Sequence, residues 1–228
     1  MKLSYAITVK DELEEVTRLI EFLIKHKRTE DEIIILFDTG GSVDVHVYLD
    51  SIDHEDIFII QDQFKGNFAD WKNLLTSYCT GDYIFQIDAD EYPDEVLVLT
   101  LPEILELTGE VDIILVPRVN TVKGITEAHI KKWGWIMNDK GWVNFPDFQW
   151  RIYKNSPYIK WKNKVHEVLT GYKSYATLPE RQEYSLYHPK TIDRQEKQNS
   201  SYLLLQKERN NELSKNLGSN NGSSTKRK

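Results

Sequence analysis

The sequence contains little cysteine, no excess of positive charge and no long apolar run. Its single cysteine, Cys79, excludes an internal disulfide and a zinc site built from several cysteines. Lysine and arginine number 29 against 36 aspartate and glutamate residues, a formal charge of −7. This balance argues against a protein that coats DNA or RNA, because neutralising phosphates requires a basic face. No apolar stretch approaches the roughly 20 residues that span a bilayer.

The first ten residues alternate apolar and polar side chains, and an acidic pair, Asp11 and Glu12, follows them. A secretion signal would instead show a continuous apolar core, so we expect none here. The lack of disulfides fits a reducing compartment. We therefore expect a cytoplasmic protein, which would reach a membrane only peripherally.

Strand-like and helix-like segments alternate through the first half of the chain. Short runs rich in β-branched residues predict strands, and apolar residues every three to four positions predict helices. The strands are expected over 3–9, 33–37, 57–60, 83–87 and 112–116, and the helices over 14–25, from 42 onward, over 68–79 and over 96–107. This order predicts an α/β protein with a mostly parallel sheet flanked by helices.

The composition changes about halfway along the chain. Five of the six tryptophans lie in the second half, among short β-prone runs. We expect one domain over 1–209, in which 118–209 forms a smaller mixed region built onto the sheet of 1–117. A helical pattern returns over 192–209, and Asn, Ser, Gly and Lys then dominate 210–228, which predicts a disordered tail.

Acidic and polar side chains gather where the expected strands end. They are Thr8, Lys10, Asp11 and Glu12 after the first strand, Asp38 after the second, and Asp88, Asp90 and Glu91 after the fourth. Parallel α/β sheets bind ligands beyond the carboxyl ends of their strands. No glycine-rich phosphate loop follows the first strand, which argues against a dinucleotide fold and a P-loop. Carboxylates repel a bare pyrophosphate, and a divalent cation held between them removes that repulsion.

The sharpest local signal is the pair Asp88 and Asp90 around the small Ala89. At a strand end, such a pair can place one carboxylate on a metal and the other on a ribose hydroxyl. The alternative interpretation is an acidic surface turn, since two acids at this spacing are common by chance.

Several segments resemble, in the same order, the motifs of family 2 glycosyltransferases, which have the GT-A fold. The resemblance covers roughly residues 3–205. It includes an Asp-x-Asp motif and the downstream signature of a bacterial and viral branch, which ends in His-Glu. The segments are Val9-Lys10-Asp11-Glu12, Asp38-Thr39-Gly40-Gly41-Ser42, Asn67-Phe68-Ala69-Asp70-Trp71-Lys72-Asn73, Gln86-Ile87-Asp88-Ala89-Asp90-Glu91, Arg151-Ile152-Tyr153-Lys154-Asn155 and Val165-His166-Glu167.

The resemblance implies an inverting glycosyltransferase that moves a sugar from a UDP- or GDP-sugar to a hydroxyl acceptor, with Mn²⁺ or Mg²⁺ as cofactor. Asp90 and His166 would bind the metal, and the imidazole favours Mn²⁺. Residues 1–117 would bind the nucleotide sugar and 118–209 the acceptor, which is a saccharide, a lipid-linked molecule or a protein. The residues expected to contact the nucleotide sugar are Thr8, Lys10, Glu12, Asp38, Asp70, Lys72, Asp88 and Arg151.

Inversion requires a general base that takes the proton of the acceptor hydroxyl. Asp147 is expected to be this base, because it lies in the zone where family members usually place it; Glu167 and Glu127 are alternatives. Arg151 either contacts the diphosphate or pairs with an acid. His188 is expected to have a structural role.

Two other functions compete with this interpretation. A nucleotidyltransferase acting on sugar phosphates also uses carboxylates after a parallel strand, but it would ordinarily show a glycine-rich basic loop after the first strand. A non-catalytic carbohydrate-binding protein on a degenerate transferase fold is permitted by the tryptophans, since aromatic rings stack on sugars. We expect Trp150 and Trp161 in a small core and Trp133 and Trp135 in an exposed loop or lid.

Overall fold

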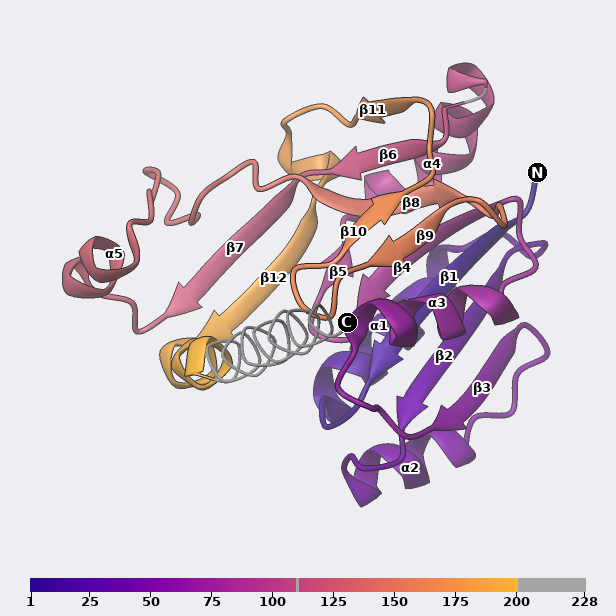
Figure 1. The fold of residues 1–228 in the computed structure, drawn as a ribbon, viewed down its shortest axis with the longest axis horizontal. Helices are drawn as coiled ribbons and strands as arrows, with labels where there is room; N and C mark the ends of the chain where they lie inside the picture. The colour runs from indigo at the N-terminus through magenta and orange to yellow at the C-terminus, as the bar shows by residue number, and fades with distance from the viewer. Residues whose placement is uncertain (110, 201–228) are drawn as a thin grey trace, which may run out of the picture.

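The computed structural model describes residues 1–109 and 111–200. In this part of the chain, the central sheet has seven strands in the order β11-β6-β8-β4-β1-β2-β3 (Figure 1). Only β8 runs antiparallel to its neighbours, β4 and β6. The predicted mostly parallel sheet is therefore confirmed. The bounds are β1 Leu3–Val9, β2 Glu32–Asp38, β3 Ile57–Asp62, β4 Tyr83–Asp88, β6 Ile113–Val116, β8 Gln149–Lys154 and β11 Tyr175–Thr177.

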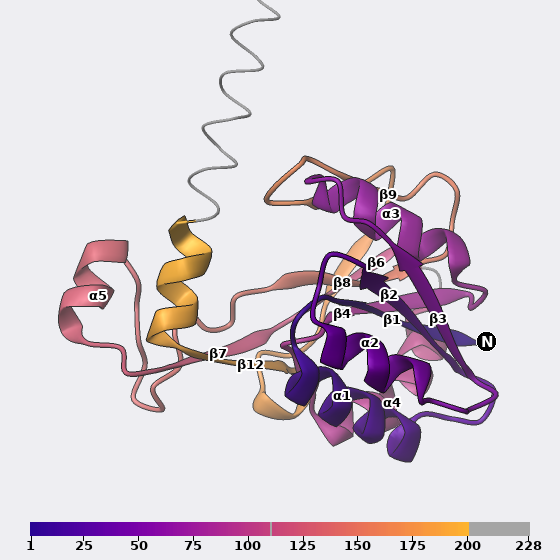
Figure 2. The same cartoon turned by 90° about the horizontal axis from the view of Figure 1, so that it is seen from below.

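Helices cover both faces of the sheet, because the central strands bury side chains on each side. The helices α1 (Leu13–His26), α2 (Val43–Asp50) and α4 (Glu95–Thr108) lie on one face (Figure 2). The helix α3 (Phe68–Tyr78) covers the other face, and the hairpin of β9 (Lys160–Lys162) and β10 (Val168–Thr170) lies against it. Each face has its own apolar core. On the α1 side, helical spacing buries Val16, Leu19, Ile20 and Leu23.

A second, three-stranded sheet extends away from the first (Figure 1). Its strands are β5 (Tyr92–Pro93), β12 (Leu186–Thr191) and β7 (Arg118–Lys123). The short helix α5 (Glu127–Trp133) follows β7, a 3-10 turn (Gln182–Tyr184) precedes β12, and residues 192–200 after β12 are helical.

The predicted strands and helices are all present, and their ends differ from the predicted ones by at most two residues. The C-terminal helix is present as far as residue 200; its predicted remainder and the predicted tail, 210–228, lie outside the described residues. The second half of the chain also supplies β8 and β11 to the central sheet, so both halves share one sheet. Among the described residues, no helix has the length and apolar character needed to cross a bilayer.

A buried carboxylate ties together the amino-terminal ends of the central strands. Glu32 is 3% exposed, and its oxygens accept hydrogen bonds from Lys2, from Ser4 Oγ at 2.6 Å and from the Thr80 N–H at 2.6 Å. Burial alone would raise the pKa of Glu32, but these hydrogen bonds outweigh it and bring the pKa below its ordinary value. The charged form of Glu32 therefore stabilises the folded state.

We expect Glu32→Gln to lower the free energy of unfolding at pH 7 by about 1–3 kcal/mol, the cost of losing hydrogen bonds to a buried charge. Because the folded-state pKa is lowered, this contribution is present above the unfolded-state pKa of about 4.3 and is lost as the pH falls through the folded-state pKa. Urea unfolding at pH 7 and pH 3 measures both. The deficit of the variant should shrink at pH 3, whereas the exposed Glu30→Gln should show no such change. An equal deficit at both pH values would contradict this account.

Candidate active site

Two adjoining cavities open at the carboxyl ends of the central strands. The strand-end cavity, of about 750 Å³, lies beyond β1, β2 and β4 and is lined by Thr8, Glu12, Asp38, Phe64, Phe68 and Trp71, among others. The loop cavity, of about 370 Å³, is lined mainly by the second half of the chain, including Trp135, Asp147, Trp150, Arg151 and His166. The residues that line both cavities are Lys72, Asp88, Asp90, Glu167, Lys190 and Gln198.

Strand register explains why Asp88 and Asp90 lie on this border. Asp88 is the last residue of β4 and lies beside Thr8 of β1, whose hydroxyl is 3.3 Å from Asp88 Oδ1. The turn after Asp88 carries the chain into β5, which pairs with β12. Alternate residues of a strand face the same side, so His188 and Lys190 of β12 both meet Asp90, which lies in that turn.

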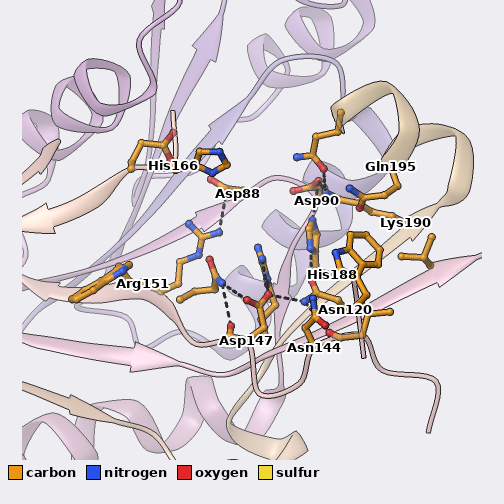
Figure 3. Close-up of a pocket in the computed structure, with 18 of the residues that line it drawn as sticks. Asp88, Asp90, Asn120, Asn144, Asp147, Arg151, His166, His188, Lys190 and Gln195 are labelled. Atoms are coloured by element: carbon orange, nitrogen blue, oxygen red, sulfur yellow. Dashed lines mark hydrogen bonds and ion pairs between the residues drawn. The ribbon is translucent and has the colours of Figure 1, made fainter. Parts of the chain in front are cut away.

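Five charged side chains alternate in sign between Asp88 and Asp147, and Figure 3 labels three of them, Asp88, Arg151 and Asp147. Arg151 Nη2 lies 2.6 Å from Asp88 Oδ2 and 2.7 Å from Glu91 Oε1. Glu91 also pairs with Arg118 at 2.9 Å, and Arg118 pairs with Asp147 at 2.7 Å. Burial would raise the pKa of Asp88, but Arg151 and then Lys72 hold it far below its ordinary value. Arg151 is thus paired with two acids, one of the two uses predicted for it.

The backbone around Asp147 aims its carboxylate into the loop cavity. Asn144 and Asp147 have φ values of 54° and 35°, a turn that most residues avoid. Asp147 Oδ2 accepts hydrogen bonds from Arg118 Nε at 2.9 Å and from Asn120 Nδ2 at 2.6 Å, while Oδ1 accepts one from Gln149 Nε2 at 3.0 Å. These hydrogen bonds fix the direction of the carboxylate, and the Asp147 side chain is 28% exposed.

Asp90 is surrounded by basic side chains. Its Oδ2 lies 3.3 Å from His188 Nε2, 3.6 Å from Arg194 Nη2 and 3.8 Å from Lys190 Nζ. Burial would raise the pKa of Asp90, but the hydrogen bond and charge of His188, followed by the charge of Lys190, lower it well below its usual range. Asp90 is therefore ionised and neutralised by its neighbours.

Comparison with known proteins identifies the family of this chain. A family model described as "Glycosyl transferase family 2" matches residues 4–176. The chain belongs to glycosyl transferase family 2. Among curated proteins, none matches it.

Solved structures of the Staphylococcus aureus protein TarS share the fold of this family 2 chain. TarS 1–349 superposes with a TM-score of 0.57 at 13% sequence identity, over 83% of this chain and 60% of that one. The complex of TarS 1–349 with UDP-GlcNAc gives 0.50 at 14% identity, over 81% and 60%. Since the chain spans at most about 60% of these TarS chains, they establish its fold and no more. The predicted GT-A class is confirmed.

Most residues predicted to contact the nucleotide sugar do line the cavities. Thr8, Lys10, Glu12, Asp38, Lys72 and Asp88 line the strand-end cavity, and Arg151 lines the loop cavity. Asp70 lines neither cavity: it is exposed in the first turn of α3, where Asn67 Nδ2 donates to it at 2.6 Å. Glu127, an alternative base, is exposed at the start of α5 and also lines neither cavity.

The second alternative base, Glu167, lies on the border and pairs with Lys72 Nζ at 3.2 Å. Lys72 is buried and lies 4.7 Å from the ring of Trp161. Asp38 accepts hydrogen bonds from the Gly40 and Phe64 N–H groups and pairs with Lys10. Burial would raise the pKa of Asp38, but these contacts lower it below its ordinary value.

Among the described residues, protein side chains alone do not complete a metal site, although a divalent cation that also binds substrate phosphates needs only one or two carboxylates. Within residues 1–109 and 111–200, no three His, Cys, Asp or Glu side chains form a group able to hold a metal ion. His166 lines the loop cavity beside Asp88 (Figure 3), whereas Asp90 faces Lys190 and Arg194 instead of further acids. Asp90 and His166 as metal ligands stay a prediction from the sequence, and we derive no chemical step through a metal.

Sequence reasoning missed several residues of the site. Phe64 and Phe68, whose ring centroids lie 4.6 Å apart, form an aromatic wall of the strand-end cavity. His188, expected to be structural, lines the loop cavity, where its Nδ1 is 2.8 Å from Asn120 Oδ1 and its Nε2 contacts Asp90. The spacing of His188 and Lys190 along one strand predicts that both side chains face the same side. No local sequence pattern indicated that Arg194 belongs to the site.

Trp161 is buried as predicted, and Trp150 is half-buried at the loop cavity. Trp133 and Trp135 are both half-buried rather than exposed. Trp133 stacks on His129 within α5, and Trp135 lines the loop cavity.

Proposed function

We propose that this family 2 protein transfers a sugar, with inversion, from a nucleoside-diphosphate sugar to a hydroxyl acceptor. The observation that carries the proposal is the meeting of two cavities at Asp88, Asp90 and Glu167. Transfer requires that donor and acceptor bind in adjoining sites, so that the attacking hydroxyl lies close to the anomeric carbon of the sugar. The Asp-x-Asp-Glu and His-Glu segments on this border support membership of the bacterial and viral branch.

The donor occupies the strand-end cavity in this proposal. Thr8, Glu12 and Asp38 offer oxygen atoms to the base and ribose, and Phe64 and Phe68 offer faces on which a base can stack. The first half of the chain lines most of this cavity, which supports the division into a nucleotide-sugar half, 1–117, and an acceptor half, 118–209. UDP is the first nucleotide to test, because a TarS structure holds UDP-GlcNAc.

The acceptor occupies the loop cavity, where Trp135 and Trp150 provide surfaces for a saccharide. Its hydroxyl oxygen attacks the anomeric carbon and forms the new C–O bond. The bond from that carbon to the phosphate oxygen breaks, and its electron pair leaves with the nucleoside diphosphate. Asp147 takes the hydroxyl proton as general base. A single displacement of this kind inverts the anomeric centre.

A saccharide fits the aromatic and polar lining of the loop cavity, whether it is free, lipid-linked or attached to a protein. We propose a cytoplasmic site of action with peripheral access to membrane-borne acceptors.

Thermal unfolding with a panel of ligands tests the proposal. UDP-GlcNAc or another UDP- or GDP-sugar at about 100 times its Kd should stabilise the fold by about 2.7 kcal/mol and raise Tm by about 5 °C or more. The panel is run with and without Mn²⁺, and nucleoside triphosphates serve as the comparison. A response to triphosphates alone would favour a nucleotidyltransferase, and a response to saccharides without any nucleotide would favour a carbohydrate-binding protein.

A further inference from the structure

Two parallel strands of the second sheet connect Asp147 to the other end of the site. On β7, Arg118 and Asn120 face the same side, and both donate hydrogen bonds to Asp147 Oδ2. On β12, His188 is the register partner of Asn120, and its Nε2 lies 3.3 Å from Asp90 Oδ2. The contacts of the two carboxylates therefore meet at Asn120, which lies between Asp147 and His188 (Figure 3).

The partners of Asn120 allow its amide only one orientation. Its Nδ2 lies 2.6 Å from Asp147 Oδ2 and 3.4 Å from the backbone oxygen of Val143. Both of these oxygens accept hydrogen bonds and donate none, so the amide nitrogen must face them. The amide oxygen, Oδ1, then faces His188 Nδ1 at 2.8 Å. Because an amide oxygen only accepts, His188 Nδ1 carries a hydrogen and donates it.

His188 and Asp90 keep the Asn120 amide from turning over. His188 is 8% exposed, and its ring is held between Asn120 and Asp90. If the amide turned over, its nitrogen would face the N–H of His188 and its oxygen would face the Asp147 carboxylate. Neither contact would then have both a donor and an acceptor. The direction of the Asn120 amide is therefore fixed from the side of Asp90, which borders both cavities.

These contacts make the two oxygens of Asp147 unlike each other. Oδ2 accepts hydrogen bonds from Arg118 Nε at 2.9 Å, from Arg118 Nη2 at 2.7 Å and from Asn120 Nδ2 at 2.6 Å. In the described part of the chain, Oδ1 accepts one, from Gln149 Nε2 at 3.0 Å. A carboxylate has about four lone-pair sites shared by its two oxygens. Oδ2 is therefore fully occupied, whereas Oδ1 has room for a further donor.

We propose that Asn120 is a positioning residue, which together with Arg118 occupies Asp147 Oδ2 and leaves Oδ1 as the oxygen that takes the proton of the acceptor hydroxyl. The inference rests on the function proposed above, in which Asp147 is the general base. The proton moves to Oδ1 while the hydroxyl oxygen forms its bond to the anomeric carbon. Holding the carboxylate in one direction keeps this oxygen aligned with the hydroxyl, which raises the rate of the chemical step. Asn120 acts through Asp147 and exchanges no proton with the acceptor.

Steady-state kinetics of the full chain tests the proposal, with UDP-GlcNAc or the UDP- or GDP-sugar that stabilises the fold most, and with a panel of saccharide acceptors. Asn120→Ala should lower kcat by about 10- to 100-fold, the value of one hydrogen bond to a charged group, at unchanged KM for the donor. Asn120→Asp should lower kcat at least as far, because it still accepts from His188 but sets a carboxylate against Asp147. Thr121→Ala is the matched control, since Thr121 is the next residue of β7, faces the opposite side and lines neither cavity.

A double-mutant cycle separates positioning from a general loss of structure. Asp147→Asn has no carboxylate to position, so adding Asn120→Ala to it should change kcat by less than about twofold. A merely structural role of Asn120 would lower kcat by the same factor with Asp147 present or replaced. If circular dichroism shows that Asn120→Ala does not fold, Asn120→Asp, which has nearly the same shape, takes its place in the cycle.

The outcomes separate this inference from the function on which it rests. If Asn120→Ala keeps the wild-type kcat, or lowers kcat equally in both backgrounds, the inference is overturned and the transferase function stands. If Asp147→Asn keeps its kcat, the base is another residue, and the inference again fails alone. If the wild-type protein transfers sugar from no donor of the panel, the proposed function fails and the inference fails with it.

Discussion

Replacing Asp147 by asparagine is expected to lower kcat by about 10²–10⁴-fold, the usual contribution of a general base. An amide cannot take the proton of the acceptor hydroxyl. The variant keeps the shape of the side chain, and Arg118 keeps its contact with Glu91 at 2.9 Å, so the fold should persist, with some loss of stability because one of the two side-chain oxygens becomes a nitrogen that can no longer accept a hydrogen bond. The strand-end cavity, which Asp147 does not line, should be unchanged. Steady-state kinetics with donor and acceptor varied separately, together with titration of UDP, measures both effects.

Two variants sharpen this test. Asp139→Asn is the matched control, because Asp139 is exposed in the same segment and lines neither cavity. Glu167→Gln examines the alternative base, which pairs with Lys72 on the border. If Asp147→Asn keeps its kcat and Glu167→Gln loses activity at unchanged donor affinity, the base is Glu167. A rise in KM for the acceptor alone would make Asp147 a positioning residue.

Replacing Arg151 by methionine is expected to be the most destabilising single change at the site. The Arg151 side chain is 4% exposed and bridges Asp88 and Glu91. Methionine fills similar space but leaves both carboxylates without this cation. Removing one partner of a buried ion pair costs about 3–5 kcal/mol, which corresponds to a fall in Tm of about 6–20 °C for a chain of this size. Transfer activity should be lost as well, because Asp88 loses its anchor at the border.

The cause of that loss can be checked with a second change. If the penalty comes from uncompensated charge, Arg151→Met combined with Asp88→Asn should recover part of the unfolding free energy measured in urea. The exposed Arg181→Met should stay within about 0.5 kcal/mol of wild type. A single Arg151→Met variant within about 1 kcal/mol of wild type would contradict the role assigned to this guanidinium.

Local patterns were sufficient for the central sheet and for one edge of the site. Continuous β-branched runs mark strands buried on both faces, such as Ile33 to Phe37, and those runs end at fixed points in the chain. Parallel strands bring their carboxyl ends to the same edge, so the strand pattern alone places Thr8, Asp38 and Asp88 together. This strand pattern does not apply to Asp70, which lies in the first turn of a helix, where its side chain is exposed to solvent.

By itself, the sequence determined the order of strands and helices, the acidic strand ends and the resemblance to family 2 glycosyltransferases. Only the tertiary structure decided which charges meet. The antiparallel insertion of β8 brings Arg151 to Asp88, the pairing of β12 with β5 brings Lys190 to Asp90, and a left-handed turn aims Asp147. Periodicity is a property of neighbouring residues, so it can be read from the chain. Pairing between distant strands depends on how the whole core packs, and no local pattern specifies it.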